Sequence, residues 1–255
     1  MIYLFGDLHG VYNIDKRYNS ENFPEGNSLT KNDYVIILGD FGIPWFSKDS
    51  DEYKYEISKL RELSNKNWTT LFIDGNHENF DNLNSFPTEE KFGSVVSKIE
   101  DSIYWLRRGK IYNIENKKFF TFGGAASIDR GNRTEGYSWW REEVPSIKEM
   151  EEGIDNLEKE NYEVDYVLTH TIPDSIIDKM IKFYGLNRYD INDTTSKFLE
   201  EIYKRIKCKK WFFGHWHFDF ATRDYDSPYT SKTEYYGFMY KYATLNTETD
   251  TITIS

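Results

Sequence analysis

Cysteine is almost absent from this sequence of 255 residues, in which Cys208 is the single example. No disulfide can therefore form within the chain, and the bonds that stabilise many secreted domains are excluded. We expect a reducing compartment, which favours a cytoplasmic location. Cys208 itself is expected to be a buried apolar residue.

Long apolar runs are also missing. The first run, "MIYLF", ends at residue 5 and no basic segment precedes it, unlike a secretory signal peptide. No stretch approaches the roughly 20 apolar residues that a membrane-spanning helix needs. We therefore expect a soluble protein with no membrane partner.

Basic residues are fewer than acidic ones: the sequence has 32 Lys and Arg and 43 Asp and Glu, which gives a formal net charge of −11. General binding to nucleic acid backbones or anionic membranes is therefore not expected. A phosphorylated partner would need a local positive site. The sequence does not indicate an oligomeric state.

Flexible linkers, internal repeats and low-complexity segments are not evident either. The 18 Phe, 20 Tyr and 7 Trp supply bulky side chains for a core. We therefore expect a single domain over residues 1–255.

Short apolar runs rich in branched and aromatic residues recur, and each ends abruptly in small or polar residues. Such runs predict buried strands that lead into loops, over residues 1–7, 33–40, 68–76, 119–125, 165–170 and 210–217. Helical spacing of apolar residues predicts helices between them, over 51–66, 145–161 and 194–207. Short strands are expected in 99–123, and a hairpin or edge strands in 235–255.

This alternation predicts an α/β fold with a mixed sheet, or two sheets packed together, and helices outside. In such folds ligands bind beyond the C-terminal ends of the strands. The aromatic residues of the Tyr-rich stretch 225–242 are expected to pack against the sheet or a helix.

All five histidines stand at the end of a predicted strand. The segments that hold them are "GDLHG", "GNHE", "LTHT" and "GHWH", and two aspartates and an asparagine occupy the same kind of position. Imidazole, carboxylate and amide oxygen without thiolate suit Mn, Fe, Co or Zn. The set is too large for one tetrahedral zinc and would fill two sites that share one carboxylate, an arrangement that supports in-line displacement at phosphorus. Its members are Asp7, His9, Asp40, Asn76, His77, His170, His215 and His217.

"GDLHG", "GDFG", "GNHE", "LTH" and "GHWH", in this order between residues 6 and 217, resemble the signature of the calcineurin-like metallophosphoesterase superfamily. The resemblance implies mixed β-sheets packed as a sandwich and flanked by helices, a four-layer αββα fold with a dinuclear metal site at the strand C-terminal ends. It also implies two divalent metal ions, with Mn²⁺ favoured and Fe, Zn, Co or Ni possible.

The resemblance gives each residue a role. Asp40 would bridge the metals, and His77 would stabilise the transition state or protonate the leaving oxygen. The first metal would be held by Asp7, His9 and His217, and the second by Asn76, His170 and His215. If "DLH" and "HWH" are extended, their outer residues point to the same side, whereas the adjacent Asn76 and His77 must diverge.

The chemistry that follows is hydrolysis of a small phosphomonoester, phosphodiester or nucleotide by a bridging hydroxide. Two alternatives remain open. Serine/threonine protein phosphatases of the superfamily carry "GDxVDRG", where this chain has "GDFGIPW", and "GHWH" is more similar to phosphodiesterase, nuclease and nucleotide-hydrolase branches. A non-catalytic scaffold would tend to lose ligands, and this chain keeps the full set.

Other charged residues have two interpretations each. Arg130 and Arg133 lie in a predicted loop, 122–146, where they could hold the phosphate of the substrate or be solvated. Asp74, Glu78 and Asp174 could orient imidazoles of the site or lie on the surface.

Overall fold

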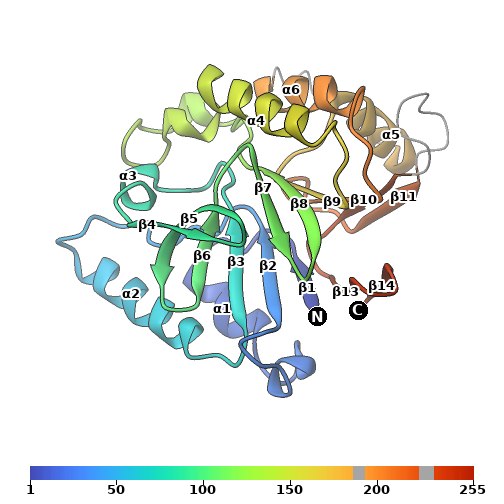
Figure 1. The fold of residues 1–255 in the computed structure, drawn as a ribbon. Helices are drawn as coiled ribbons and strands as arrows, with labels where there is room; N and C mark the ends of the chain where they lie inside the picture. Colours follow the sequence, from blue (N-terminus) through green and yellow to red (C-terminus); the bar gives the residue numbers. More distant parts are fainter. Residues whose placement is uncertain (186–192, 224–232) are drawn as a thin grey trace.

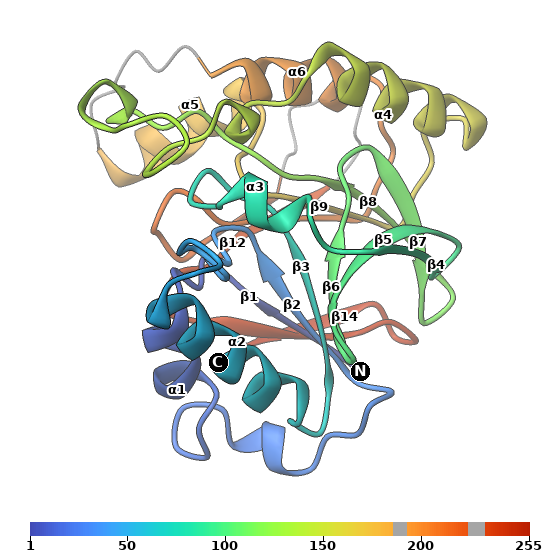
Figure 2. The same ribbon diagram turned by 90° about the vertical axis from the view of Figure 1, so that its left-hand side faces the viewer.

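The structure is a computed structural model that describes residues 1–185, 193–223 and 233–255. Two β-sheets lie face to face, and helices cover the outer side of each (Figures 1 and 2). The predicted α/β fold with packed mixed sheets and outer helices is confirmed. Within the described ranges, no helix is both long and apolar enough to cross a membrane.

The first sheet has eight strands among the described residues, in the order β14-β13-β1-β2-β3-β6-β5-β4. Neighbouring β1, β2, β3 and β6 run parallel, and the other pairs are antiparallel. The strands are β1 (Ile2–Phe5), β2 (Tyr34–Leu38), β3 (Thr69–Ile73), β4 (Thr88–Lys91), β5 (Ser94–Glu100), β6 (Ile103–Leu106), β13 (Tyr242–Asn246) and β14 (Thr251–Ile254).

The second sheet has six strands among the described residues, in the order β11-β12-β10-β9-β8-β7. Neighbouring β8, β9, β10 and β12 run parallel, and β7 and β11 are antiparallel to their neighbours. The strands are β7 (Lys110–Ile114), β8 (Lys117–Phe122), β9 (Tyr166–Thr169), β10 (Lys210–Phe213), β11 (Phe220–Arg223) and β12 (Glu234–Gly237).

Helices α1 and α2 cover the first sheet, and α4, α5 and α6 cover the second (Figure 2). The three predicted helices are confirmed with shorter ends, whereas α1, α3 and α5 were not expected from the sequence. Ser146 caps α4 in a reciprocal capping box with Glu149, which defines the start of that helix. The helices are α1 (Val11–Arg17), α2 (Asp51–Ser64), α3 (Phe80–Leu83), α4 (Ile147–Lys159), α5 (Asp174–Tyr184) and α6 (Thr194–Tyr203).

Alternate side chains of the central strands enter different cores. In β1, Tyr3 and Phe5 pack toward α1 and α2, whereas Ile2 and Leu4 pack between the two sheets. A third core, which includes Trp211 of β10, lies between the second sheet and α4 to α6. Each Leu, Ile or Phe so buried contributes roughly 1.5–3 kcal/mol. Burial on both faces explains the continuous apolar runs of the sequence and makes the fold four layers deep.

The C-terminal tail has the expected hairpin, in which β14 pairs antiparallel with β13. Of the Tyr-rich stretch, residues 225–232 lie outside the described ranges. In its described part, Tyr235 stacks on Trp211 at 5.8 Å and Tyr242 stacks on Phe5 at 4.8 Å between ring centroids, so these aromatics pack as expected. Cys208 is only partly buried, against the outer core of the second sheet.

Candidate metal centre

The predicted metal ligands and His77 lie in loops that follow five strands, each of which runs parallel to a neighbour in its own sheet. Strands β1, β2 and β3 are neighbours in the first sheet, and β9 and β10 are neighbours in the second. The carboxyl ends of these strands meet at one edge of the sandwich, where α/β folds bind ligands. The loops carry Asp7 and His9 after β1, Asp40 after β2, Asn76 and His77 after β3, His170 after β9, and His215 and His217 after β10.

The backbone of these loops differs from the prediction. The segments around His9 and His217 are not extended, because β1 ends at Phe5 and β10 at Phe213. His9, His215 and His217 have φ angles of 54°, 64° and 53°, in the left-handed region. Non-glycine residues adopt this region rarely, and such residues cluster at functional sites.

Two glycines permit close contacts between the loops. A Cβ atom on Gly39 would lie 2.0 Å from Nδ1 of His170, and one on Gly214 would lie 2.1 Å from Oδ1 of Asp7. Neither distance leaves room for a side chain. The glycines that precede Asp40 and His215 are therefore required for the backbone to pass beside the site.

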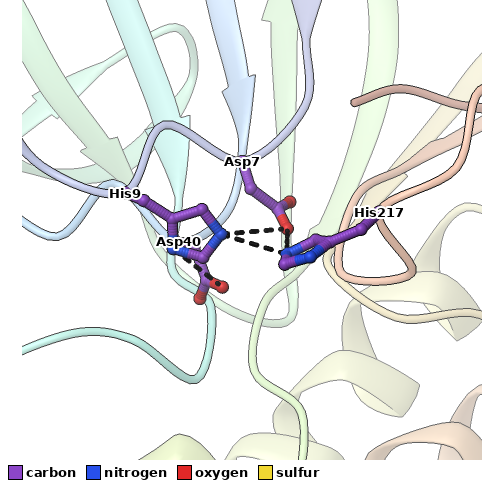
Figure 3. Close-up of side chains that lie close together, drawn as sticks. All are labelled: Asp7, His9, Asp40 and His217. Carbon is purple, nitrogen blue, oxygen red and sulfur yellow. Dashed lines mark hydrogen bonds and ion pairs between the residues drawn. The ribbon is translucent and has the colours of Figure 1, made fainter. Parts of the chain in front are cut away.

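Asp7, His9, Asp40 and His217 form the first cluster, and their side chains converge in Figure 3. Each offers one potential ligand atom, and these atoms all lie within 4.8 Å of one another. Nε2 of His217 is 3.0 Å from Nε2 of His9 and 3.0 Å from Oδ2 of Asp7. The structure thus brings together the residues predicted for the first metal with the predicted bridging aspartate.

The first cluster fits a divalent cation. Oδ1 of Asp7 accepts a hydrogen bond from the backbone amide of His215 at 2.8 Å. Oδ2 is buried and is not paired in a hydrogen bond among the described residues, and the Nε2 atoms of His217 and His9 lie 3.0 and 3.7 Å from it. Ligand atoms about 2.1 Å from one ion and at right angles lie ~3.0 Å apart, which matches the two separations that His217 makes, with His9 and with Asp7.

The second cluster surrounds His170, which is completely buried. Its Nδ1 lies 2.8 Å from the carbonyl oxygen of Leu38, to which it can donate, so that Nε2 faces the site. This Nε2 atom is 3.1 Å from Oδ1 of Asn76 and 3.2 Å from Oδ1 of Asp40. The ring of His215 is 4.9 Å from that of His170 between centroids.

Asp40 lies between the two clusters. One carboxylate oxygen faces His170 as described, and the other is 3.8 Å from Nδ1 of His9. Burial alone would raise the pKa of Asp40, but the His170 imidazole and other nearby histidines hold it well below its usual range. Burial alone would lower the pKa of His170, but the Asp40 carboxylate raises it to about 10. The centre therefore favours positive charge beside Asp40.

Two residues that the sequence analysis missed fix the amide of Asn76. Nδ2 of Asn76 donates to Oγ of Ser127 at 3.0 Å, and this hydroxyl donates to Oε2 of Glu143 at 2.6 Å. Glu143 is completely buried. The chain of hydrogen bonds orients Oδ1 of Asn76 toward His170. No sequence pattern predicts these hydrogen bonds, because Ser127 is 51 residues from Asn76.

The side chain of His77 has other neighbours than that of Asn76, which faces His170. The ring of His77 lies 5.3 Å from that of His9 between centroids, while its backbone amide donates to Oδ1 of Asp40 at 2.7 Å. Burial lowers the pKa of His77, an effect that nearby Arg133 increases and Asp40 opposes. Nη1 of Arg133 is 3.2 Å from Nδ1 of His77. One of the two predicted phosphate-binding arginines is therefore at the site.

Arg130 is placed differently. Its side chain is exposed, and it is not among the residues that line the cavity of about 630 Å³ beside His77 and Arg133. The guanidinium of Arg133 is also anchored, because Nη2 donates to Oδ2 of Asp129 at 2.8 Å. The structure therefore separates two arginines that the sequence could not distinguish.

The carboxylates of Asp74 and Glu78 are buried and contact no imidazole of the site through a described hydrogen bond. Asp74 accepts from Nε of Arg108 at 2.8 Å. Glu78 accepts from the backbone amides of Phe41 and Gly42 at 2.7 and 2.9 Å, and burial together with nearby Asp40 raises its pKa to about 8. Glu78 thus fastens the loop after β3 to the loop after β2.

Comparisons with known proteins agree with this geometry. The sequence profile of the calcineurin-like phosphoesterase family matches residues 1–219. A lariat debranching enzyme from Schizosaccharomyces pombe is 25% identical over 214 residues, which cover 75% of this chain and 44% of that protein. The chain thus spans less than half the length of this relative.

Proposed function

Because the chain belongs to the calcineurin-like phosphoesterase family, we propose that it is a metal-dependent phosphoester hydrolase with a dinuclear metal centre. The observation that carries the proposal is the position of Asp40, whose two oxygens face two separate sets of potential ligands. A single catalytic domain over residues 1–255 is part of this proposal, as is a cytoplasmic location, which rests on the single cysteine.

The proposed ligands follow from the two clusters. Asp7, His9 and His217 would hold one divalent ion, Asn76, His170 and His215 the other, and Asp40 would bridge them. The set combines imidazole and oxygen ligands without thiolate, which suits Mn, Fe, Co or Zn, and the resemblance to the family favours Mn²⁺ among them. Two such ions supply charge stabilisation and a water molecule activated for attack at neutral pH.

His77 and Arg133 would act on the substrate. His77 lines the cavity next to both clusters, so its ring can donate a hydrogen bond to a phosphoryl oxygen or a proton to the leaving oxygen. Arg133, held by Asp129, can bind a non-bridging phosphate oxygen from the side of the cavity. The proposed substrate is a small phosphomonoester, phosphodiester or nucleotide.

Debranching of lariats, the activity in the name of the relative from S. pombe, is a second candidate. The match supports it, and the formal net charge of −11 opposes it, since a long polyanion would be repelled by most of the surface. Protein phosphatase activity has less support, because "GDFGIPW" lacks the aspartate and arginine of that branch.

The proposed function predicts metal-dependent turnover. Purified protein loaded with Mn²⁺ should hydrolyse p-nitrophenyl phosphate or bis(p-nitrophenyl) phosphate. EDTA should abolish turnover and added Mn²⁺ should restore it, because the phosphate needs the cationic centre. Metal analysis should find two ions per chain. Protein that binds far less than this and hydrolyses neither ester would instead be a non-catalytic scaffold.

Arg133→Ala should raise KM at least about tenfold, because a charge-assisted hydrogen bond to phosphate contributes roughly 1.5–3 kcal/mol. Arg130→Ala is the matched control, since it removes the same group from the same loop but outside the cavity. Its KM should stay within twofold of the wild-type value. Equal effects of the two substitutions would show that Arg133 does not bind the phosphate.

A further inference from the structure

Two clefts flank His77, and the proposed metal centre lies beside both. The first, which we call the Trp216 cleft, has a volume of about 630 Å³ and the second, the Trp45 cleft, about 340 Å³. His77 lines both, so the clefts meet at the residue that faces the reacting phosphate.

The Trp216 cleft has an apolar wall and a polar wall. Met180 and Ile181 of α5 and Trp216 and Phe218 of the loop after β10 form the apolar wall, and Arg133 belongs to the polar one. Phe218 stacks on Tyr184 at 4.8 Å between ring centroids. Packing on Tyr184 therefore supports Phe218 in the apolar wall.

The Trp45 cleft is also lined by aromatic side chains, and hydrogen bonds to a buried carboxylate hold its loop in place. Tyr12 and Phe46 line it, with 77% and 45% of their surfaces exposed. The buried carboxylate of Glu56 accepts hydrogen bonds from the backbone amides of Trp45 and Phe46 at 2.8 and 3.1 Å. These bonds hold the loop that carries the aromatic wall. Because the wall is already formed, less conformational entropy is lost when a ligand binds.

We infer that the substrate is a phosphodiester with an aryl or nucleoside group on each side of phosphorus, one in each cleft. This inference rests on the proposed function and narrows it. A monoester has one organic group and would leave one aromatic cleft without a ligand. A diester has two, which its tetrahedral phosphorus directs apart, and the two clefts share His77 but no other lining residue.

The reaction then has a defined balance. An oxygen–phosphorus bond forms from the attacking hydroxide, and the bond from phosphorus to one ester oxygen breaks. The bonding pair stays on that oxygen, which takes a proton from His77 or solvent. The products are one alcohol and one phosphomonoester.

The test compares two diesters with the same leaving group, bis(p-nitrophenyl) phosphate and methyl p-nitrophenyl phosphate. With Mn²⁺ bound, kcat/KM should be at least tenfold higher for the first, because only it fills both clefts. Phe46→Ala and Phe218→Ala each shorten one aromatic wall. At least one of them should lower this preference fivefold or more, mainly through KM.

Tyr240→Ala is the matched control, because Tyr240 is an exposed aromatic residue that lines neither cleft. It should keep the wild-type preference, and circular dichroism of all variants should match the wild type. A preference below twofold, or one that both cleft variants keep, would overturn the two-cleft inference and leave the proposed function intact. Protein with two Mn²⁺ per chain that cleaves neither diester nor p-nitrophenyl phosphate would overturn both.

Discussion

Asp40→Asn should abolish hydrolysis, with kcat/KM at least roughly 10³-fold below wild type. A bridging carboxylate supplies charge to both metal positions, and loss of even an outer partner of a metal ligand typically costs 10–100-fold in metal affinity or activity. Asparagine keeps the shape of the side chain but removes the negative charge between His170 and His9. Its amide group would also direct N–H bonds toward an imidazole or a cation on one side.

Two measurements test this expectation. Turnover of bis(p-nitrophenyl) phosphate should vanish, and the metal content should fall from two ions per chain to one or fewer. Asp101→Asn is the matched control, because Asp101 is 86% exposed and its only described ion pair is with Lys98. It should retain activity and metal. An Asp40→Asn protein that keeps both would remove Asp40 from the metal centre.

His77→Ala should lower kcat roughly 10²–10⁴-fold, the usual contribution of general acid–base catalysis, while metal content stays at two ions per chain. The imidazole of His77 belongs to neither cluster of potential ligands. Its backbone amide, which donates to Asp40 at 2.7 Å, is unaffected by the substitution. The centre should therefore assemble, and only the group that faces the substrate is lost.

The leaving group distinguishes the two proposed roles of His77. If it protonates the leaving oxygen, the loss of kcat should be larger for an alkyl phosphoester than for a p-nitrophenyl ester, whose anion leaves without a proton. If it only stabilises the transition state, the losses should be similar. If His77→Ala kept the wild-type kcat with both substrates, both roles would be excluded.

Much of the fold was predictable because its signals are local. Strands β1, β2, β3, β9 and β10 are buried on both faces, so their sequences are continuous apolar runs, and α2, α4 and α6 have clear apolar spacing. Helix α5 was not predicted, although Pro173 and Gly185 mark its two ends. The backbone after the strands was predicted wrongly as extended, because left-handed turns at His9, His215 and His217 depend on tertiary contacts that residue type does not reveal.

By itself, the sequence determined the kind of chemistry, since residue types and their order after the strands specify imidazole, carboxylate and amide groups at one edge of an α/β fold. Tertiary structure decided how these groups are supported and what lies next to them. It selected Arg133 over Arg130, joined Glu143 through Ser127 to Asn76, and placed aromatic clefts on both sides of His77. The physical reason is that strand patterns depend on neighbouring residues, whereas these contacts join residues far apart in the chain and exist only after the layers pack.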